Sequence, residues 1–229
     1  MADVVKIDEY TYRIEDGFVR FFLLIGEDKA TLIDSGVMCK NALELVKKIT
    51  DKEVILVNTH GDGDHTSGTG SFDKIYMHIN DYEGCGVDTK YPNTSLVALN
   101  DNDEIDLGNR TLKVVFIPGH TKGSLAFIDV KNRVLYSGDS VQKGHIFMFG
   151  KHRIPELFIE SLDKLIVLID EYDYIYACHD EYCLNSDYVY KIKDAWNKVL
   201  NNELTYEMID VHGNKVKSYT DEYCGFYCE

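Results

Sequence analysis

The sequence predicts a mixed α/β fold in which two sheets pack face to face and helices cover the outside. Short strand-like runs separated by hairpin turns fill the first third of the chain, and later strand-like runs alternate with amphipathic helical patterns. Some runs are continuously apolar, which is typical of strands buried on both faces. A chain of 229 residues is long enough for one large domain of this kind.

In the first third, runs of apolar, β-branched and aromatic residues end at turns. The expected strands are Val4–Ile7, Tyr10–Ile14, Val19–Ile25 and Thr31–Ile33. Hairpin turns are expected at Glu15-Asp16-Gly17 and Gly26-Glu27-Asp28. A helix is expected from Asn41 to Ile49, where Leu43, Val46 and Ile49 repeat at helical spacing, and a buried strand over Val54–Val57 follows.

The rest of the chain repeats this alternation. The further expected strands are Thr111–Ile117, Ser124–Val130, Arg133–Tyr136 and Tyr174–Cys178, and the further expected helices are Pro155–Ile169 and Tyr188–Asn201. No internal repeat and no linker rich in Pro, Gly or Ser divides the sequence. We therefore expect a single domain spanning residues 1–229.

The charge balance argues against polyanionic partners. Lys and Arg number 24 and Asp and Glu number 39, which leaves a net charge of -15. Nucleic acids and anionic membrane surfaces both require a basic footprint, so neither is an expected partner. No run approaches the roughly 20 apolar residues of a membrane span. The first residues lack a signal-peptide pattern, so a cytoplasmic location with reduced thiols is expected, and the oligomeric state is left open.

The most informative stretch follows the buried strand Val54–Val57. It reads Asn-Thr-His60-Gly-Asp62-Gly-Asp64-His65, which places four potential metal ligands close together with glycines between them. Turns are often rich in Asp and Gly, so a solvated loop is the alternative interpretation. Two histidines and two aspartates at the carboxyl end of a buried strand are a rarer combination and favour a metal site.

Three later strands end in the same manner. His120 follows Thr111–Ile117, Asp139 follows Arg133–Tyr136, and His179 follows the strand that begins at Tyr174. A single histidine near a strand end is more often a hydrogen-bonded structural residue. Four such strand ends in one chain indicate a shared site.

This set resembles the metallo-β-lactamase-fold superfamily of metallohydrolases. The resemblance rests on Asp34 in Leu-Ile-Asp-Ser-Gly, on the loop from His60 to His65, and on the three later strand-end residues. It implies a four-layer αββα sandwich, with two mixed β-sheets and helices on the outer faces, and a dinuclear metal site at one edge. It implies that one metal is held by His60, Asp62 and His120, a second metal by Asp64, His65 and His179, and that Asp139 bridges them. A hydroxide between the metals would be the nucleophile, with Asp64 and Asp139 as catalytic residues.

One position departs from the family pattern, because Asp62 stands where the superfamily usually has a second histidine. A carboxylate oxygen lies as many bonds from Cα as the Nδ1 atom of histidine, so Asp62 can reach the same metal. A third carboxylate makes the site harder and more negative. Two divalent ions are expected, with zinc as the first choice and iron or manganese as alternatives.

The segment after Asp139 is basic in an otherwise acidic chain. We expect His145, Lys151, His152 and Arg153 to line the site and attract an anionic small-molecule substrate, with a solvated charged loop as the alternative. The predicted activity is hydrolysis of a small ester, thioester, lactone or related bond. The alternatives are a stand-alone diiron protein that binds or reduces oxygen and a non-catalytic relative of the fold.

Overall fold

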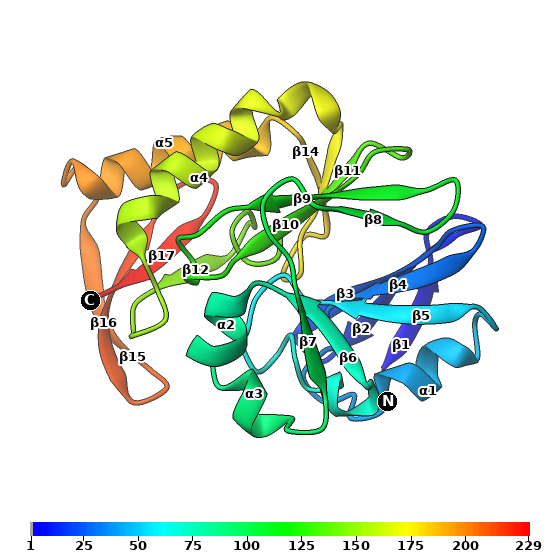
Figure 1. Ribbon diagram of the computed structural model, residues 1–229. Coiled ribbons are helices and arrows are strands. Elements are labelled where there is room, and N and C mark those ends of the chain that lie inside the picture. The colour runs from blue at the N-terminus through cyan, green and yellow to red at the C-terminus, as the bar shows by residue number, and fades with distance from the viewer. Residues whose placement is uncertain (1) are drawn as a thin grey trace.

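The computed structural model describes residues 2–229 and has four layers (Figure 1). Two β-sheets face each other in the middle. Helices α1 (Ala42–Lys47), α2 (Ile79–Gly84) and α3 (Val87–Lys90) cover the outer face of the first sheet. Helices α4 (Pro155–Val167) and α5 (Tyr188–Leu200) cover the outer face of the second sheet. The αββα sandwich expected from the sequence is thereby confirmed.

The first sheet contains seven strands in chain order, antiparallel from β1 to β4 and parallel from β4 to β7. They are β1 (Asp3–Lys6), β2 (Thr11–Asp16), β3 (Val19–Ile25), β4 (Lys29–Ile33), β5 (Glu53–Val57), β6 (Lys74–Met77) and β7 (Ser95–Ala98). A short 3-10 helix, Thr69–Ser71, lies between β5 and β6. The parallel strands all deliver their carboxyl ends to the same edge.

The second sheet has the spatial order β14-β13-β11-β10-β9-β8, and β11 with β13 is its one parallel pair in the described chain. Its strands are β8 (Glu104–Asp106), β9 (Thr111–Phe116), β10 (Leu125–Asp129), β11 (Val134–Tyr136), β13 (Tyr174–Tyr176) and β14 (Cys183–Asn185). A second 3-10 helix, Ile169–Glu171, precedes β13.

A third sheet, which we did not expect from the sequence, closes one end of the sandwich. It has the order β12-β17-β16-β15, with β12 (His145–Met148), β15 (Tyr206–Val211), β16 (Asn214–Thr220) and β17 (Gly225–Cys228). The segment after Asp139, for which no strand was expected, therefore contains one. The pairing explains why: β12 lies parallel to β17, with Phe147 opposite Tyr227.

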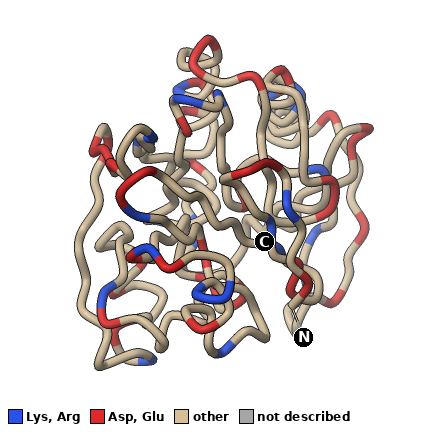
Figure 2. The backbone as a smooth tube through the Cα atoms, turned by 90° about the vertical axis from the view of Figure 1, so that its right-hand side faces the viewer, with Lys and Arg blue, Asp and Glu red and all other residues tan. Residues whose placement is uncertain are grey.

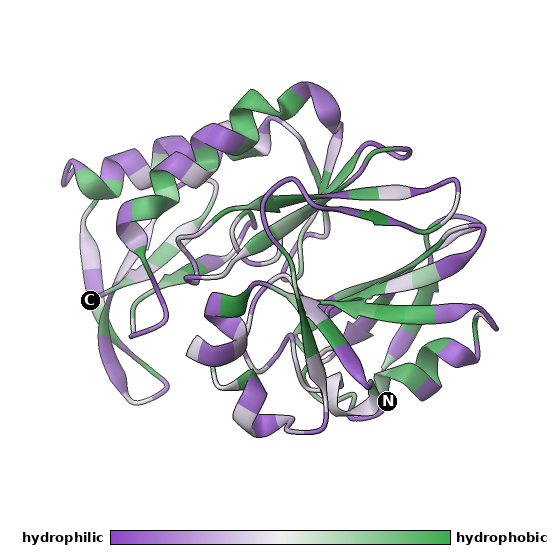
Figure 3. Cartoon of the chain, viewed as in Figure 1, coloured by the Kyte–Doolittle hydropathy of each residue, from purple (hydrophilic) through white to green (hydrophobic). Residues whose placement is uncertain are grey.

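The core follows from the alternation of side chains along each strand. On β3, Phe22 and Leu24 point between the two sheets, whereas Phe21 and Leu23 point toward α1. On β10, Phe127 points between the sheets and Ile128 toward α4 and α5. Strands buried on both faces are apolar at nearly every position, and Figure 3 shows apolar residues along these central strands and polar residues on the outer helix faces.

The charges are dispersed over the surface. Figure 2 shows short basic segments interspersed with more numerous acidic ones. Within residues 2–229, no helix has the length and apolar character that crossing a membrane requires.

Removal of a side chain from the layer between the sheets should destabilise the fold strongly. Phe127 is fully buried there, so Phe127→Ala should lower the free energy of unfolding by about 3–5 kcal/mol, measured by urea denaturation. The control Tyr190→Ala removes a 48% exposed aromatic side chain from α5 and should cost about 0.5 kcal/mol or less. Equal losses in the two variants would contradict this assignment of the core.

Candidate metal centre

All seven residues expected to bind metal lie at one edge of the sandwich, in loops that leave strand ends. The loop after β5 carries four of them, and the loops after β9, β11 and β13 carry one each. The seven are His60, Asp62, Asp64, His65, His120, Asp139 and His179. Both sheets contribute, so the group spans the junction between them.

The four histidines share one orientation rule: Nδ1 faces an oxygen of the protein and Nε2 faces the centre. The Nδ1 partners are Thr59 Oγ1 for His60 at 3.0 Å, Asp34 Oδ2 for His65 at 2.9 Å, the Phe147 carbonyl for His120 at 3.0 Å and the Phe18 carbonyl for His179 at 2.9 Å. A carbonyl oxygen only accepts, so Nδ1 of His120 and of His179 must carry the proton. Their Nε2 atoms are then free to bind a cation.

Asp139 lies between two pairs of histidines. Its Oδ1 is 3.2 Å from Nε2 of His65 and 3.3 Å from Nε2 of His179. Its Oδ2 is 3.9 Å from Nε2 of His60 and 3.7 Å from Nε2 of His120. One carboxylate thus presents one oxygen to each pair.

A further carboxylate accompanies each pair. Asp62 Oδ2 lies 3.6 Å from Nε2 of His60 and 3.4 Å from Nε2 of His120. Asp64 Oδ2 lies 3.7 Å from Nε2 of His65 and 3.5 Å from Nε2 of His179. The side chains of Asp62 and Asp64 are 22% and 23% exposed, so the centre opens to solvent on their side.

The donor atoms fit divalent cations. Nε2 of His60, His65 and His120 and Oδ1 of Asp139 are buried and have no hydrogen-bond partner among the described residues. Leaving several buried polar atoms unpaired at one place is costly unless a ligand satisfies them. Imidazole nitrogens together with carboxylate oxygens are the donor set that zinc and related metals prefer.

The electrostatics also favour a cation. Burial opposes protonation of His65, but Asp139 and Asp34 outweigh it and raise its pKa well above the ordinary value. Burial likewise opposes ionisation of Asp139, yet His179 and His65 hold its pKa well below the usual range. The cluster is therefore a place where buried carboxylates stay charged and attract positive charge.

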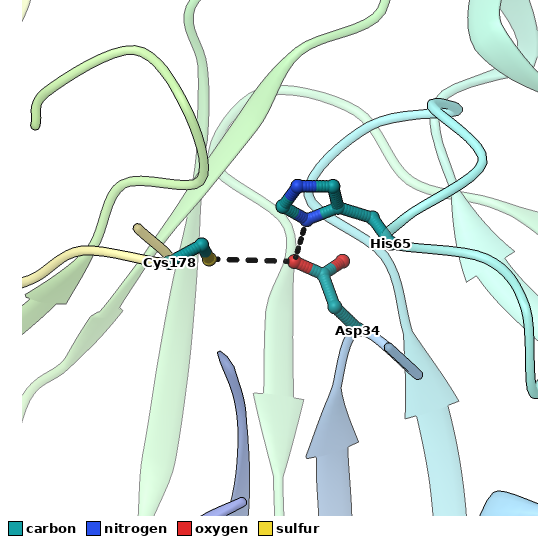
Figure 4. A group of neighbouring side chains, drawn as sticks. All are labelled: Asp34, His65 and Cys178. Atoms are coloured by element: carbon teal, nitrogen blue, oxygen red, sulfur yellow. Dashed lines mark hydrogen bonds and ion pairs between the residues drawn. The ribbon is translucent and has the colours of Figure 1, made fainter. Parts of the chain in front are cut away.

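Asp34 orients the loop that bears His65. It is fully buried at the end of β4, with a φ of 65° that places it in the left-handed region. Its carboxylate accepts hydrogen bonds from the Thr59 backbone N–H and hydroxyl, each at 2.8 Å, and from Nδ1 of His65. Asp34 Oδ2, which accepts from His65, also lies 3.8 Å from the Cys178 sulfur. Figure 4 shows these three side chains, with the other ring nitrogen of His65 pointing away from Asp34. Burial raises the pKa of Cys178 to about 12, so this thiol stays neutral.

Asp81 on α2 joins the two histidine loops, and the sequence did not reveal it. It is buried and accepts hydrogen bonds from the Gly61 N–H at 2.9 Å, the Thr121 hydroxyl at 2.6 Å and the Gly123 N–H at 2.7 Å. Gly61 must be glycine here, because a Cβ would lie 2.5 Å from the Cβ of Cys85. Asp81 therefore connects the loop of the first sheet with that of the second.

The residues expected to bind substrate are dispersed. Arg153 donates to both oxygens of Asp62, at 3.1 Å and 2.5 Å, and from Nε to the Phe147 carbonyl at 3.1 Å. His145 lies on β12, where its ring stacks on Tyr227 at 4.3 Å. Lys151 is exposed and His152 is half-buried in the loop before α4. A substrate would find Arg153 already engaged.

The chain is similar to known proteins in sequence as well as in fold. The family model of the metallo-beta-lactamase superfamily matches residues 14–179, and the chain belongs to that superfamily. The matched range begins in β2 and ends at His179, so it includes all seven residues of the centre.

Curated relatives of the chain are hydrolases. It is 30% identical over 179 residues to a hydroxyacylglutathione hydrolase of a Synechococcus species, covering 76% of this chain and 67% of that protein. It is 23% identical over 188 residues to the acyl-coenzyme A thioesterase MBLAC2 of Homo sapiens, covering 65% and 67% of the two chains. Among solved structures, a metallo-beta-lactamase from Pontibacter korlensis matches with a TM-score of 0.73 at 14% identity over 86% of this chain and 99% of its own. That likeness shows the shared fold.

Loss of Asp81 should weaken the centre without touching a ligand atom. In Asp81→Asn, an amide must replace a carboxylate that accepts from three donors, so the two loops lose part of their connection. We expect zinc affinity, measured by competition with a chromophoric chelator, to fall about tenfold or more. The control Glu83→Ala removes the same charge from an exposed position on α2 and should leave zinc affinity unchanged. Identical affinities in both variants would exclude this role of Asp81.

Proposed function

We propose that this chain is a thioester hydrolase that uses two divalent cations, with zinc as the expected metal. The observation that carries the proposal is the convergence of four imidazole Nε2 atoms on the two oxygens of Asp139. Further support comes from relatives whose names describe the hydrolysis of acyl groups carried on glutathione or coenzyme A.

Each cation would be held by one half of the cluster. His60, Asp62 and His120 would hold the first cation, Asp64, His65 and His179 the second, and Asp139 would bridge them. When bound, two such cations lower the pKa of water held between them and polarise a thioester carbonyl. The Asp64 side chain is 23% exposed, so the carboxylate oxygen that does not face the cation would be free to orient a water molecule and take its proton.

The apolar part of the acyl group would contact the rim next to His179. The ring of Phe18 stacks on the imidazole of His179 with centroids 5.9 Å apart, and it is 67% exposed. Met38, 59% exposed, places its methyl group against Gly17, the residue before Phe18. Apolar side chains this exposed beside a reactive centre favour an apolar substrate group.

The bridging position gives the decisive test of the proposed function. Asp139→Ala removes the carboxylate that would bind both cations, so zinc content should fall from two ions per chain to one or none. Thiol release from an acyl-glutathione and an acyl-coenzyme A should fall at least about a thousandfold. The control Asp170→Ala removes an exposed carboxylate and should change neither value. Parent protein that binds zinc but hydrolyses neither thioester would contradict the proposal, and parent protein that binds iron without hydrolysing them would favour the diiron alternative.

The basic loop before α4 gives a second test, which concerns the substrate charge. Among the basic residues of the segment after Asp139, Lys143 is paired with Glu181 and Arg153 with Asp62, whereas Lys151 is exposed and would be free to attract an anionic leaving group. Lys151→Ala should raise KM for acyl-coenzyme A severalfold and leave kcat nearly unchanged, because uniform binding is lost. The increase should shrink as ionic strength rises. If KM is the same in parent and variant at every salt concentration, the loop is a solvated charged loop and does not bind substrate.

A further inference from the structure

Asp62 and Arg153 form a bidentate ion pair inside the metal centre. The guanidinium nitrogens of Arg153 lie 3.1 Å and 2.5 Å from the two carboxylate oxygens. Both side chains are largely buried, with 11% of Arg153 and 22% of Asp62 exposed. A bidentate pair at such low exposure fixes the orientation of the carboxylate as well as its charge.

Arg153 is itself fixed by the strand that orients His120. The Phe147 carbonyl on β12 accepts from Nε of Arg153 at 3.1 Å and from Nδ1 of His120 at 3.0 Å. One backbone oxygen thus sets the direction of a neutral imidazole and of a cation that holds the neighbouring carboxylate. Because β12 pairs with β17, the C-terminal sheet supports both.

The pair leaves the net charge of the centre unchanged. Asp62 adds one negative charge beside His60 and His120, and Arg153 adds one positive charge in contact with it. The two cancel, so a cation beside these histidines meets an oxygen ligand without additional net charge. An Arg153 left without Asp62 would instead be a buried, unpaired cation next to the metal position.

We propose that Asp62 and Arg153 act as one charge-neutral unit of the metal centre, in which Arg153 positions the Asp62 carboxylate beside His60 and His120 and cancels its charge. This inference rests on the proposed two-metal centre. The proposal implies that a neutral metal-binding side chain can replace Asp62 when the charge of Arg153 is removed as well, but not when Asp62 alone is changed.

A double-mutant cycle read out by zinc binding tests the proposal. Asp62→His introduces a neutral ligand but leaves Arg153 unpaired, so affinity for the second zinc equivalent should fall at least about tenfold. Asp62→His combined with Arg153→Gln removes both charges and should restore that affinity to within about threefold of the parent. Arg153→Lys keeps the charge without the bidentate geometry and should fail to rescue Asp62→His.

Controls separate the local pair from net charge and from misfolding. Lys151→Gln removes one positive charge from the same loop, and combined with Asp62→His it should give no rescue. Circular dichroism and thermal unfolding in a metal chelator establish that each variant folds, and an unfolded Arg153→Gln variant is replaced by Arg153→Met. If the effects of the two substitutions on zinc affinity are independent, so that the double variant shows their product, Asp62 and Arg153 do not act as one unit. That result leaves the two-metal proposal intact. A parent chain that binds no zinc overturns both.

Discussion

Buried carboxylates hold the loops of the metal centre in place, because they accept hydrogen bonds from backbone N–H groups of those loops. Asp34, Asp81 and Asp16 are each buried, and each accepts from at least one backbone N–H of a loop at the catalytic edge. Asp16 alone accepts from Val37, Met38 and Cys39. A buried carboxylate is costly unless it is hydrogen-bonded, so a movement of these loops would leave a carboxylate buried without its partners.

The division of labour between the sheets follows from their topology. The first sheet delivers the loop from His60 to His65, and the second sheet delivers His120, Asp139 and His179. The third sheet orients His120 from the side through a backbone carbonyl. In the proposed centre, Asp62 would add an oxygen ligand without adding net charge, because Arg153 is paired with it. The electrostatic reason to expect iron or manganese in place of zinc is correspondingly weakened.

Sequence reasoning succeeded where the physical signal is local. The bounds of β3 were predicted correctly because both of its faces are buried and every position but Arg20 is apolar. The strand-end histidines and aspartates could be identified because they follow apolar runs closely, and all but His65 and His179 lie beside a glycine. Strands β7 and β15, which the sequence did not predict, have no fully buried position, so burial imposes no regular apolar spacing on them.

The supporting contacts could not be read in the same way because their partners are distant in the chain. Asp81 is 40 positions from Thr121, and Arg153 is 91 positions from Asp62. In the sequence, Arg153 is one member of a basic cluster, and we expected its side chain to bind the substrate. In the folded chain, the Phe147 carbonyl of β12 accepts from Nε of Arg153, whose guanidinium lies against the loop after β5.

The placement of the centre at the junction of the two sheets makes the metal a cohesive element of the whole domain. Its donor atoms come from both halves of the sandwich, so separating the halves takes the donor set apart. Binding free energy is then folding free energy, and it grows with metal concentration as mass action requires. Supply of the cation would thus affect the stability of the fold as well as the proposed activity.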